Sequence, residues 1–455
     1  MTPISNVEDS IATILAIIVF FMQAGFAFLE AGSVRSKNTT SVLLKNFMDA
    51  ICGCVAYWAM GYALAFGDGN AFMGTEHFFL SGIGLYDTEF VKWFIFYVYA
   101  ITATTVVSGA MAERTQLKSY LIFTILCTGW VQPIASHWVT SEEGWLQSGI
   151  FYDHHNVTIR YVDFAGSSYI HVVGGMSALV GAAVVGARHG RLDERGNLVT
   201  ISSHATTMST LGGFIVIFGL FALNLIAHSS ISEINDGGIH GLIVVNCILA
   251  ATGGSLTAVV YRRLTDRQNK QWSLVAAING SLVGLVSISA GANVVYPYGA
   301  FAVGLVSGLV YSLSTKLVER YRVDDPLDAI AAIWTFVWAA VIFGVLACLN
   351  VLRVSSEEEL KGLDVVKHGE RAYAHNSKDS RRLTRRFSDA LGNVHGINLA
   401  TGLQWSPDGS EMQPEQPTVG GTVVENVNVE DGIRASTSTK ESPNSSIEPL
   451  EISSV

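Results

Sequence analysis

Apolar segments of about 20 residues recur along most of this sequence and limit its fold more than any other feature. A helix needs about 20 consecutive, mostly apolar residues to cross the hydrocarbon core of a bilayer. Short polar links join most of the segments. The ten candidates are 10–30, 43–66, 90–112, 119–138, 165–187, 205–227, 239–261, 272–290, 294–315 and 327–352. The pattern predicts an all-α, polytopic membrane protein that folds as a helical bundle.

Composition excludes several classes of protein. Only 15% of the 455 residues are charged, whereas soluble proteins carry about 25%. This argues against a soluble enzyme and against a nucleic-acid-binding protein, which needs a basic face. The sequence shows no pair of base and nucleophile, no phosphate-binding loop and no cluster of metal ligands. We therefore expect no enzymatic activity, cofactor or metal. The five cysteines lie within apolar segments, where we expect small buried side chains.

The distribution of basic residues predicts the orientation of the spans. The odd-numbered links are rich in Lys and Arg, and the even-numbered links are poor in them. Basic links lie on the cytoplasmic side of a membrane, so the N-terminus is predicted to lie outside. The sequon at Asn156 then falls on the outer side, where glycosylation can occur. Residues 1–9 lack the basic start of a signal peptide, and we expect no cleavage there.

The C-terminal residues conflict with a count of ten spans. Ten crossings return the chain to the outside, yet the basic run Arg381–Ser388 is typical of a cytoplasmic kinase target, with Thr384 and Ser388 as candidate acceptors. A span is therefore miscounted or missing, or the tail lies outside. We divide the chain into a membrane domain, 1–353, and a polar, largely disordered tail, 354–455, with a short helix at 357–369. The tail either regulates or only solubilises the protein.

The fifth predicted span holds the most informative polar residues. His171 lies inside it, and an ionisable group within a span is costly and a candidate for a transport pathway. Neutral imidazole donates and accepts hydrogen bonds, so it could hold a small polar guest or pass a proton. The alternative is a core histidine bonded to a backbone carbonyl. Asp163 can cap the helix and raise the local cation concentration. Small residues from Gly174 to Gly186 recur every fourth position and predict close helix packing.

Other acidic residues also stand out. Asp49 lies inside the second predicted span, and Asp324, Asp325 and Asp328 precede the last one. This trio follows Arg320 and Arg322. Helix capping and ion pairing therefore explain the trio without a function.

Several long motifs resemble the ammonium transporters of the Amt/Mep family, especially animal and plant members. The motifs are Met22–Gly32, Arg35–Thr40, Leu44–Asn46, Asp163–Ser167, His171–Gly175, Ile278–Gly280, Ala290–Gly291, Val323–Asp328 and Leu352–Gly369. The resemblance covers residues 8–373. It implies eleven spans, an outside N-terminus, a cytoplasmic C-terminus and a homotrimer with one pore per subunit. It also implies an outer aromatic vestibule, two Phe gates and a hydrophobic channel with two facing histidines.

The sequence departs from this family pattern at several pore positions. His171 matches the first pore histidine, but the second is absent, with Ile333 at the nearest position. The sequence after Ile333 resembles the eleventh span, so we infer that the tenth is missing. The two gate positions align with Tyr99 and Leu223. At the outer mouth, beside Asp163, Thr140 and Ala227 replace the recruiting Trp and Ser. Neither supplies the same cation–π or hydroxyl contact, so a weakened cation site is predicted.

These observations favour transport of ammonium, ammonia or methylammonium through a pore containing His171, at the plasma membrane. The alternative is a non-conducting shortened isoform that forms mixed trimers with related, intact subunits and modulates them. A sensor that signals through the tail is a third hypothesis.

Overall fold

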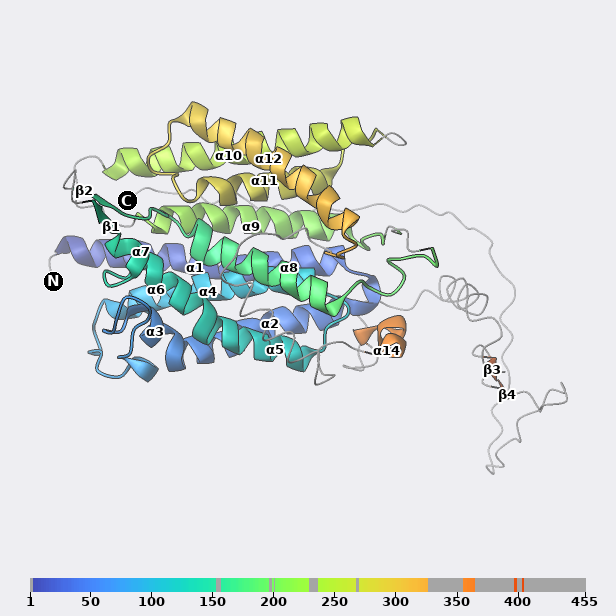
Figure 1. Ribbon diagram of the computed structural model, residues 1–455, viewed down its shortest axis with the longest axis horizontal. Coiled ribbons are helices and arrows are strands. Elements are labelled where there is room, and N and C mark those ends of the chain that lie inside the picture. The colour runs from blue at the N-terminus through green and yellow to red at the C-terminus, as the bar shows by residue number, and fades with distance from the viewer. Residues whose placement is uncertain are drawn as a thin grey trace, which may run out of the picture. The chain divides into compact units, whose positions relative to one another are not determined.

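The computed structural model describes residues 3–152, 157–195, 199, 201–228, 236–266, 270–325, 355–364, 397–398 and 403–404. They belong to two units, Met1–Ala374 and His375–Val455. The described part of the second unit consists of two strands, β3 (Ile397–Asn398) and β4 (Leu403–Gln404), which pair antiparallel. The first unit contains the helical bundle shown in Figure 1. Five predicted positions lie outside the described residues: Asn156, Asp328, Ile333, Thr384 and Ser388.

Helices occupy nine of the ten predicted spans, which confirms the helical membrane fold. Three spans contain a π-helical turn (η2, η4 or η6). The spans are α1 (Pro3–Ser33), α2 (Thr39–Ala56) with η2 (Tyr57–Gly61) and α3 (Tyr62–Phe66), α4 (Glu89–Ala110), α5 (Leu117–Leu126) with η4 (Cys127–Val131) and α6 (Gln132–Thr140), η6 (Ser167–Val172) with α8 (Val173–Val185), α9 (Thr206–Ile226), α10 (Asp236–Thr265), α11 (Leu274–Ile288) and α12 (Pro297–Arg320). Among the described residues, eight segments are long and apolar enough to cross a membrane, and α11 is shorter. Predicted span 327–352 lies outside the described residues.

Short elements join the spans at the two ends of the bundle. They are η1 (Ser36–Asn38), η3 (Phe78–Leu80), α7 (Trp145–Ser148), β1 (Ile150–Tyr152), β2 (Val157–Ile159) and α14 (Ser356–Lys361). Strands β1 and β2 form an antiparallel hairpin beside the start of α1 (Figure 1). We call this the Asp163 end. Helix α14 lies at the opposite end, which we call the Arg188 end.

Glycines let the helices approach closely, as membrane helices require in the absence of a hydrophobic drive between them. A Cβ added at Gly174 of α8 would lie 2.7 Å from the carbonyl oxygen of Ala103 in α4. This contact confirms the predicted close packing of the fifth span, and Ala178 and Ala182 are buried on the same helix. The approach holds the helix that carries His171 directly against α4.

Buried ion pairs connect several chain segments at the Arg188 end. Arg188 donates from Nε to Asp324 Oδ2 (2.8 Å) and from Nη1 to Glu113 Oε2 (3.0 Å). Arg35 Nε donates to Glu113 Oε1 (2.9 Å), and Arg191 pairs with Asp324 (3.3 Å). The prediction that ion pairing explains Asp324 is therefore confirmed, but its partners are Arg188 and Arg191 and not the neighbouring Arg320 and Arg322. Asp324 lies against the link that follows α8. There the positive charges of Arg188 and Arg191 offset the cost of burying its carboxylate.

The first part of the tail packs against the same end. Helix α14 begins with a capping box formed by Ser355 and Glu358. The carboxylate of Asp364 accepts hydrogen bonds from the backbone N–H groups of Thr40 (2.9 Å) and Ser41 (2.7 Å) at the start of α2. The short helix predicted over 357–369 is confirmed in its described part. The predicted domain boundary at 353/354 stays a prediction.

Acidification is expected to destabilise the Arg188 end. Burial alone would raise the pKa of Glu113 and of Asp324, but the adjacent arginines hold both pKa values below their ordinary range. The unfolded chain then binds more protons than the folded one, so this stabilisation is fully present above the unfolded pKa and is lost as the pH falls through the folded pKa. Thermal unfolding of the protein in detergent, measured from about pH 6 down to about pH 2, should show this loss.

An Asp324→Asn variant is the control for this pH dependence. The variant lacks one of the two titrating carboxylates. Its melting temperature near pH 6 should therefore be lower than that of the wild type and should fall less steeply as the pH decreases. Parallel curves for the two proteins would contradict the assignment.

Candidate transport pore

The segment that carries His171 is fixed at the Asp163 end by hydrogen bonds. Gly166, in the left-handed region at φ 80°, precedes the π-helical turn η6. The carboxylate of Asp163 accepts hydrogen bonds from the backbone N–H groups of Ser167 (2.8 Å) and Ser168 (2.7 Å) and from the hydroxyl of Ser168. This geometry confirms the capping interpretation of Asp163. It also orients the carboxylate toward the helix and not only toward solvent.

Helix α11 supports the same segment from the other side. The backbone N–H groups of Phe164 and Ala165 donate to the carbonyl oxygens of Ala290 (3.1 Å) and Ser289 (2.9 Å). The hydroxyl of Ser167 donates to the carbonyl oxygen of Val286 (3.1 Å). The position of His171 therefore depends on the packing of α11 as well as on α4.

The imidazole of His171 carries a buried nitrogen without a hydrogen-bond partner. Within the described part of the chain, Nε2 contacts no donor or acceptor at bonding distance. A buried polar atom without a partner is rare, because leaving it unpaired costs about 1–3 kcal/mol. The alternative of a histidine bonded through Nε2 to a carbonyl is therefore not what the structure shows. Nε2 remains available to a small guest that donates or accepts a hydrogen bond.

Aromatic rings cluster next to the segment that carries this histidine. Tyr99 is buried, and its ring lies 6.3 Å from that of Tyr169, two residues before His171. It also meets Phe96 edge-on at 5.4 Å, and Phe96 in turn lies 4.4 Å from Phe66. The ammonium group of Lys92 lies 4.1 Å from the centre of the Phe66 ring. The cluster thus already holds one ammonium group over a ring, as cation–π attraction favours.

The structure places the remaining predicted residues on other elements. Leu223 is fully buried on α9, and Ala227 ends that helix. Thr140 ends α6, where its hydroxyl donates to the carbonyl oxygen of Ser136 (2.8 Å). That these three residues share a pore with His171 stays a prediction. Asp163, His171 and Tyr99 are the predicted residues whose segments the structure brings together, through Tyr169.

Sequence reasoning missed Tyr169, Phe96 and the surroundings of Asp49. Tyr169 lies inside the motif that contains His171, and Phe96 lies one helical turn before Tyr99, so helical spacing could have found both. The carboxylate of Asp49 accepts hydrogen bonds from the hydroxyls of Thr105 (2.8 Å) and Thr124 (2.6 Å). The spacing of polar residues along the fourth span was the available signal for this second polar region.

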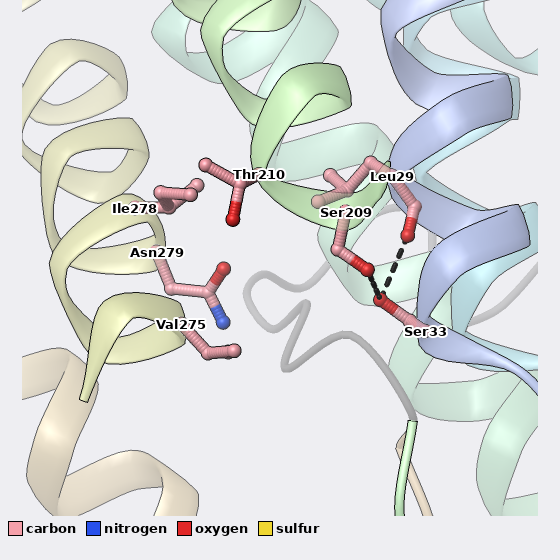
Figure 2. A pocket seen from close by; sticks show the side chains of 7 residues that line it. All are labelled: Leu29, Ser33, Ser209, Thr210, Val275, Ile278 and Asn279. Atoms are coloured by element: carbon pink, nitrogen blue, oxygen red, sulfur yellow. Dashed lines mark hydrogen bonds between the residues drawn. The ribbon is translucent and has the colours of Figure 1, made fainter. Parts of the chain in front are cut away.

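A small pocket opens between α1, α9 and α11 (Figure 2). In it the hydroxyls of Ser33 and Ser209 lie 3.1 Å apart, and Ser33 donates to the carbonyl oxygen of Leu29 (2.7 Å). The amide of Asn279 faces the pocket from α11. None of the predicted pore residues lines it, and its lining residues carry no ionisable group. Within the described ranges, no group of three or more His, Cys, Asp or Glu is arranged for a metal ion.

Comparison with known proteins gives consistent matches over most of the chain. A family model described as "Ammonium Transporter Family" matches residues 10–332 and 329–373. The two matched stretches overlap at residues 329–332, directly before Ile333. "Ammonium transporter 1 member 3" of Solanum lycopersicum is 31% identical over 445 residues, which covers 83% of this chain and 96% of that protein. "Ammonium transporter 3" of Dictyostelium discoideum is 35% identical over 318 residues, covering 69% and 70%.

Solved structures share the fold. A structure named "Sensor Amt Protein" superposes with a TM-score of 0.72 at 26% identity and covers 80% of this chain and 98% of that chain. Candida albicans Mep2 gives a TM-score of 0.63 at 21% identity, with 77% and 87% covered, and shows similarity of fold alone. No relative or structure among these supports the hypothesis of a non-conducting isoform.

Proposed function

This chain belongs to the ammonium transporter family, and on that premise we propose that it transports ammonium, ammonia or methylammonium across a membrane through a hydrophobic pore at His171. One observation carries the assignment of the pore: His171 presents a buried, unpartnered Nε2 next to a cluster of aromatic rings, at the start of a helix that Asp163 caps. The long apolar helices make the protein a multi-pass membrane protein.

The geometry supports a stepwise removal of water from the ion. Ring faces of Phe96 and Tyr99 attract a cation and replace part of its hydration shell. Leu223 can obstruct the pore at the second gate position but offers no π-face. At His171, ammonia can accept a hydrogen bond from a neutral imidazole or donate one to it. With Thr140 and Ala227 at the outer mouth, recruitment of the cation is expected to be weak.

Two contacts support a cytoplasmic position for the start of the tail. Asp324 and Glu359 flank the predicted span 327–352, and they bond to the adjacent residues Arg188 and His189 at the Arg188 end. The nine described helical spans lead from a predicted outside N-terminus to Asp324 on the cytoplasmic side, and Glu359 bonds at the same end, which supports a cytoplasmic start of the tail. The two-part match of the family model supports the absence of the tenth family span.

The remaining assignments rest on the family resemblance. We propose a homotrimer with one pore per subunit, or a mixed trimer with related subunits, in the plasma membrane. We assign no enzymatic activity, cofactor or nucleic-acid partner to the chain.

Uptake of labelled methylammonium by cells that lack their own ammonium transporters tests the pore. We expect uptake by the wild-type chain and at least a tenfold loss, about 1.4 kcal/mol or more of barrier, in His171→Ala. The reason is that alanine removes the buried, unpartnered Nε2 that His171 offers to the guest. Uptake is normalised to surface-labelled protein.

His77→Ala is the matched control, because His77 lies in an exposed loop and bonds to the carbonyl oxygen of Ser81 (2.9 Å). Surface protein without uptake would overturn the proposed function. Uptake that His171→Ala leaves unchanged would remove His171 from the pore.

A further inference from the structure

A second cavity, of about 260 Å³, opens between α10, α11 and α12 at the Arg188 end. Farther from this end α10 and α12 are in close contact, because a Cβ added at Gly308 would lie 2.5 Å from the carbonyl oxygen of Gly254. One helical turn closer to the end, Ala258 and Ser312 line the cavity, and Ala276 lines it from α11. These three small residues are buried, whereas several larger polar residues of the lining are exposed.

Two basic side chains line this cavity from different helices. Arg262 belongs to α10 and Lys316 to α12, and neither forms an ion pair with an acidic side chain in the described part of the chain. The ammonium group of Lys316 lies 4.7 Å from the centre of the Tyr261 ring, so this side chain reaches across to α10. Two positive charges therefore lie beside one cavity, where a bound anion would offset their mutual repulsion.

Acidic residues balance these charges only in part. Glu319 also lines the cavity, but it pairs at 3.9 Å with Arg191, which lies outside the lining. Asp266 is the other acidic residue of the lining. With Glu319 paired to a base outside the cavity, two bases of the lining face one acid. The cavity therefore attracts an anion more than a cation.

The threonine hydroxyls of the lining contribute less than the charges do. The hydroxyl of Thr265 donates to the carbonyl oxygen of Tyr261 (2.8 Å), and that of Thr315 donates to the carbonyl oxygen of Tyr311 (3.1 Å). Both hydrogens are therefore engaged within their own helices. A guest would be bound mainly through the guanidinium and ammonium groups, and such groups form their strongest hydrogen bonds with phosphate and carboxylate oxygens.

The surroundings of the cavity suit a lipid better than a soluble anion. Large apolar side chains next to the lining residues in sequence are exposed on α10 and α12, namely Val260, Leu264, Leu313 and Leu317. Further basic residues lie at the same ends of these helices and in the link after α10, namely Arg263, Lys270, Arg320 and Arg322. Basic cavities between spans on the cytoplasmic side of a membrane are typical sites for phosphorylated lipid headgroups. The apolar side chains offer a surface to the acyl chains of the same molecule.

We propose that this cavity binds the phosphorylated headgroup of an anionic phospholipid. Arg262 and Lys316 hold a phosphate of the headgroup between α10 and α12, and the acyl chains lie on the exposed apolar side chains of the same helices. The cavity is smaller than the roughly 300–1,000 Å³ of most small-molecule pockets, so it accommodates the headgroup and not the whole lipid. The inference goes beyond the proposed function and does not depend on transport, because it requires only that these helices lie in a membrane.

Binding of a short-chain phosphatidylinositol bisphosphate to the full-length protein in detergent tests this site. A ligand that binds only the folded state raises the melting temperature, and a titration gives its affinity. We expect Arg262→Gln together with Lys316→Gln to weaken binding at least about tenfold, because each basic residue beside an anionic headgroup strengthens the attraction. Thr265→Trp, which fills the cavity and keeps both charges, should also weaken binding.

The matched control is Arg320→Gln together with Arg322→Gln. It removes two exposed positive charges from the same end of the bundle, and neither residue lines the cavity. We expect it to weaken binding by less than about threefold, because charges outside the site act only through screened attraction. Short-chain phosphatidylcholine, which has no net charge, should bind much more weakly than the bisphosphate lipid.

Several results would overturn the proposal. Equal losses in the two double variants would mean that the lipid responds only to the general positive charge of this end. Equal binding of phosphatidylcholine would remove the requirement for an anionic headgroup. If free inositol trisphosphate or inorganic phosphate bound as tightly as the lipid, the site would be one for a soluble phosphate.

The test does not depend on a single variant or on transport. If Arg262→Gln with Lys316→Gln failed to fold, Thr265→Trp would decide, and unchanged binding of the lipid to it would overturn the site. Surface protein without methylammonium uptake would overturn the proposed function and leave the lipid measurement as it stands.

Discussion

Replacing Gly254 with leucine is expected to separate α10 from α11 and to remove most folded protein from the membrane. A Cβ at this position would lie 2.2 Å from the carbonyl oxygen of Gly280 and 3.3 Å from the Cα of Gly284. These are backbone atoms, so no rotamer change can relieve the clash. Overpacking of this kind costs about 1–3 kcal/mol for a few extra atoms, and leucine adds more than that.

The same substitution should also affect transport. Helix α11 holds the segment before His171 through the carbonyl oxygens of Ser289 and Ala290. Protein that survives in the membrane should therefore show reduced uptake. The measurements are the monodisperse fraction in size-exclusion chromatography, the melting temperature in detergent, and methylammonium uptake per surface-labelled molecule.

Gly241 provides a matched control within the same helix. A Cβ there meets nothing within 4 Å, and the residue is exposed. Gly241→Ala should be neutral or slightly stabilising, by at most about 1 kcal/mol, because alanine favours a helix. Equal losses in Gly241→Leu and Gly254→Leu would show that a general effect on the helix, and not the contact with α11, is responsible.

Replacing Arg188 with alanine is expected to lower stability by about 3–5 kcal/mol. The guanidinium bonds to both Glu113 and Asp324, and all three side chains are buried. Without it, two buried carboxylates lose a shared cation, and the link after α8 separates from the end of α12. Arg188→Lys should recover little, because a single ammonium group cannot reproduce the fork to both carboxylates.

Arg320→Ala is the control for this ion network. Arg320 is exposed at the end of α12, close in sequence to Asp324, and its replacement should change stability by less than about 0.5 kcal/mol. Thermal unfolding in detergent measures both variants. If Arg320→Ala were as damaging as Arg188→Ala, the pairing of Asp324 with Arg188 would not be the one that stabilises the fold.

Some site residues were predictable from short-range patterns. Asp163 lies four and five residues before the N–H groups that it accepts from, so its role as a cap depends on local spacing alone. His171 was identified because an ionisable group stands out in an apolar span. Its unpartnered nitrogen was not predictable, because that depends on every neighbouring helix.

The sequence by itself determined the nine spans that the structure describes, because a bilayer supplies no hydrogen-bond partners and each crossing must satisfy its own backbone. Length and apolar character, which are local properties, therefore suffice to find a span. Only the tertiary structure decided which helices touch. Asp324 pairs with Arg188, 136 positions away, and not with the arginines beside it. Asp364 caps α2 across 324 positions, and Asp49 meets Thr105 and Thr124. Such contacts depend on which segments lie side by side, and the spacing along one helix can mark a polar position but does not identify its partner.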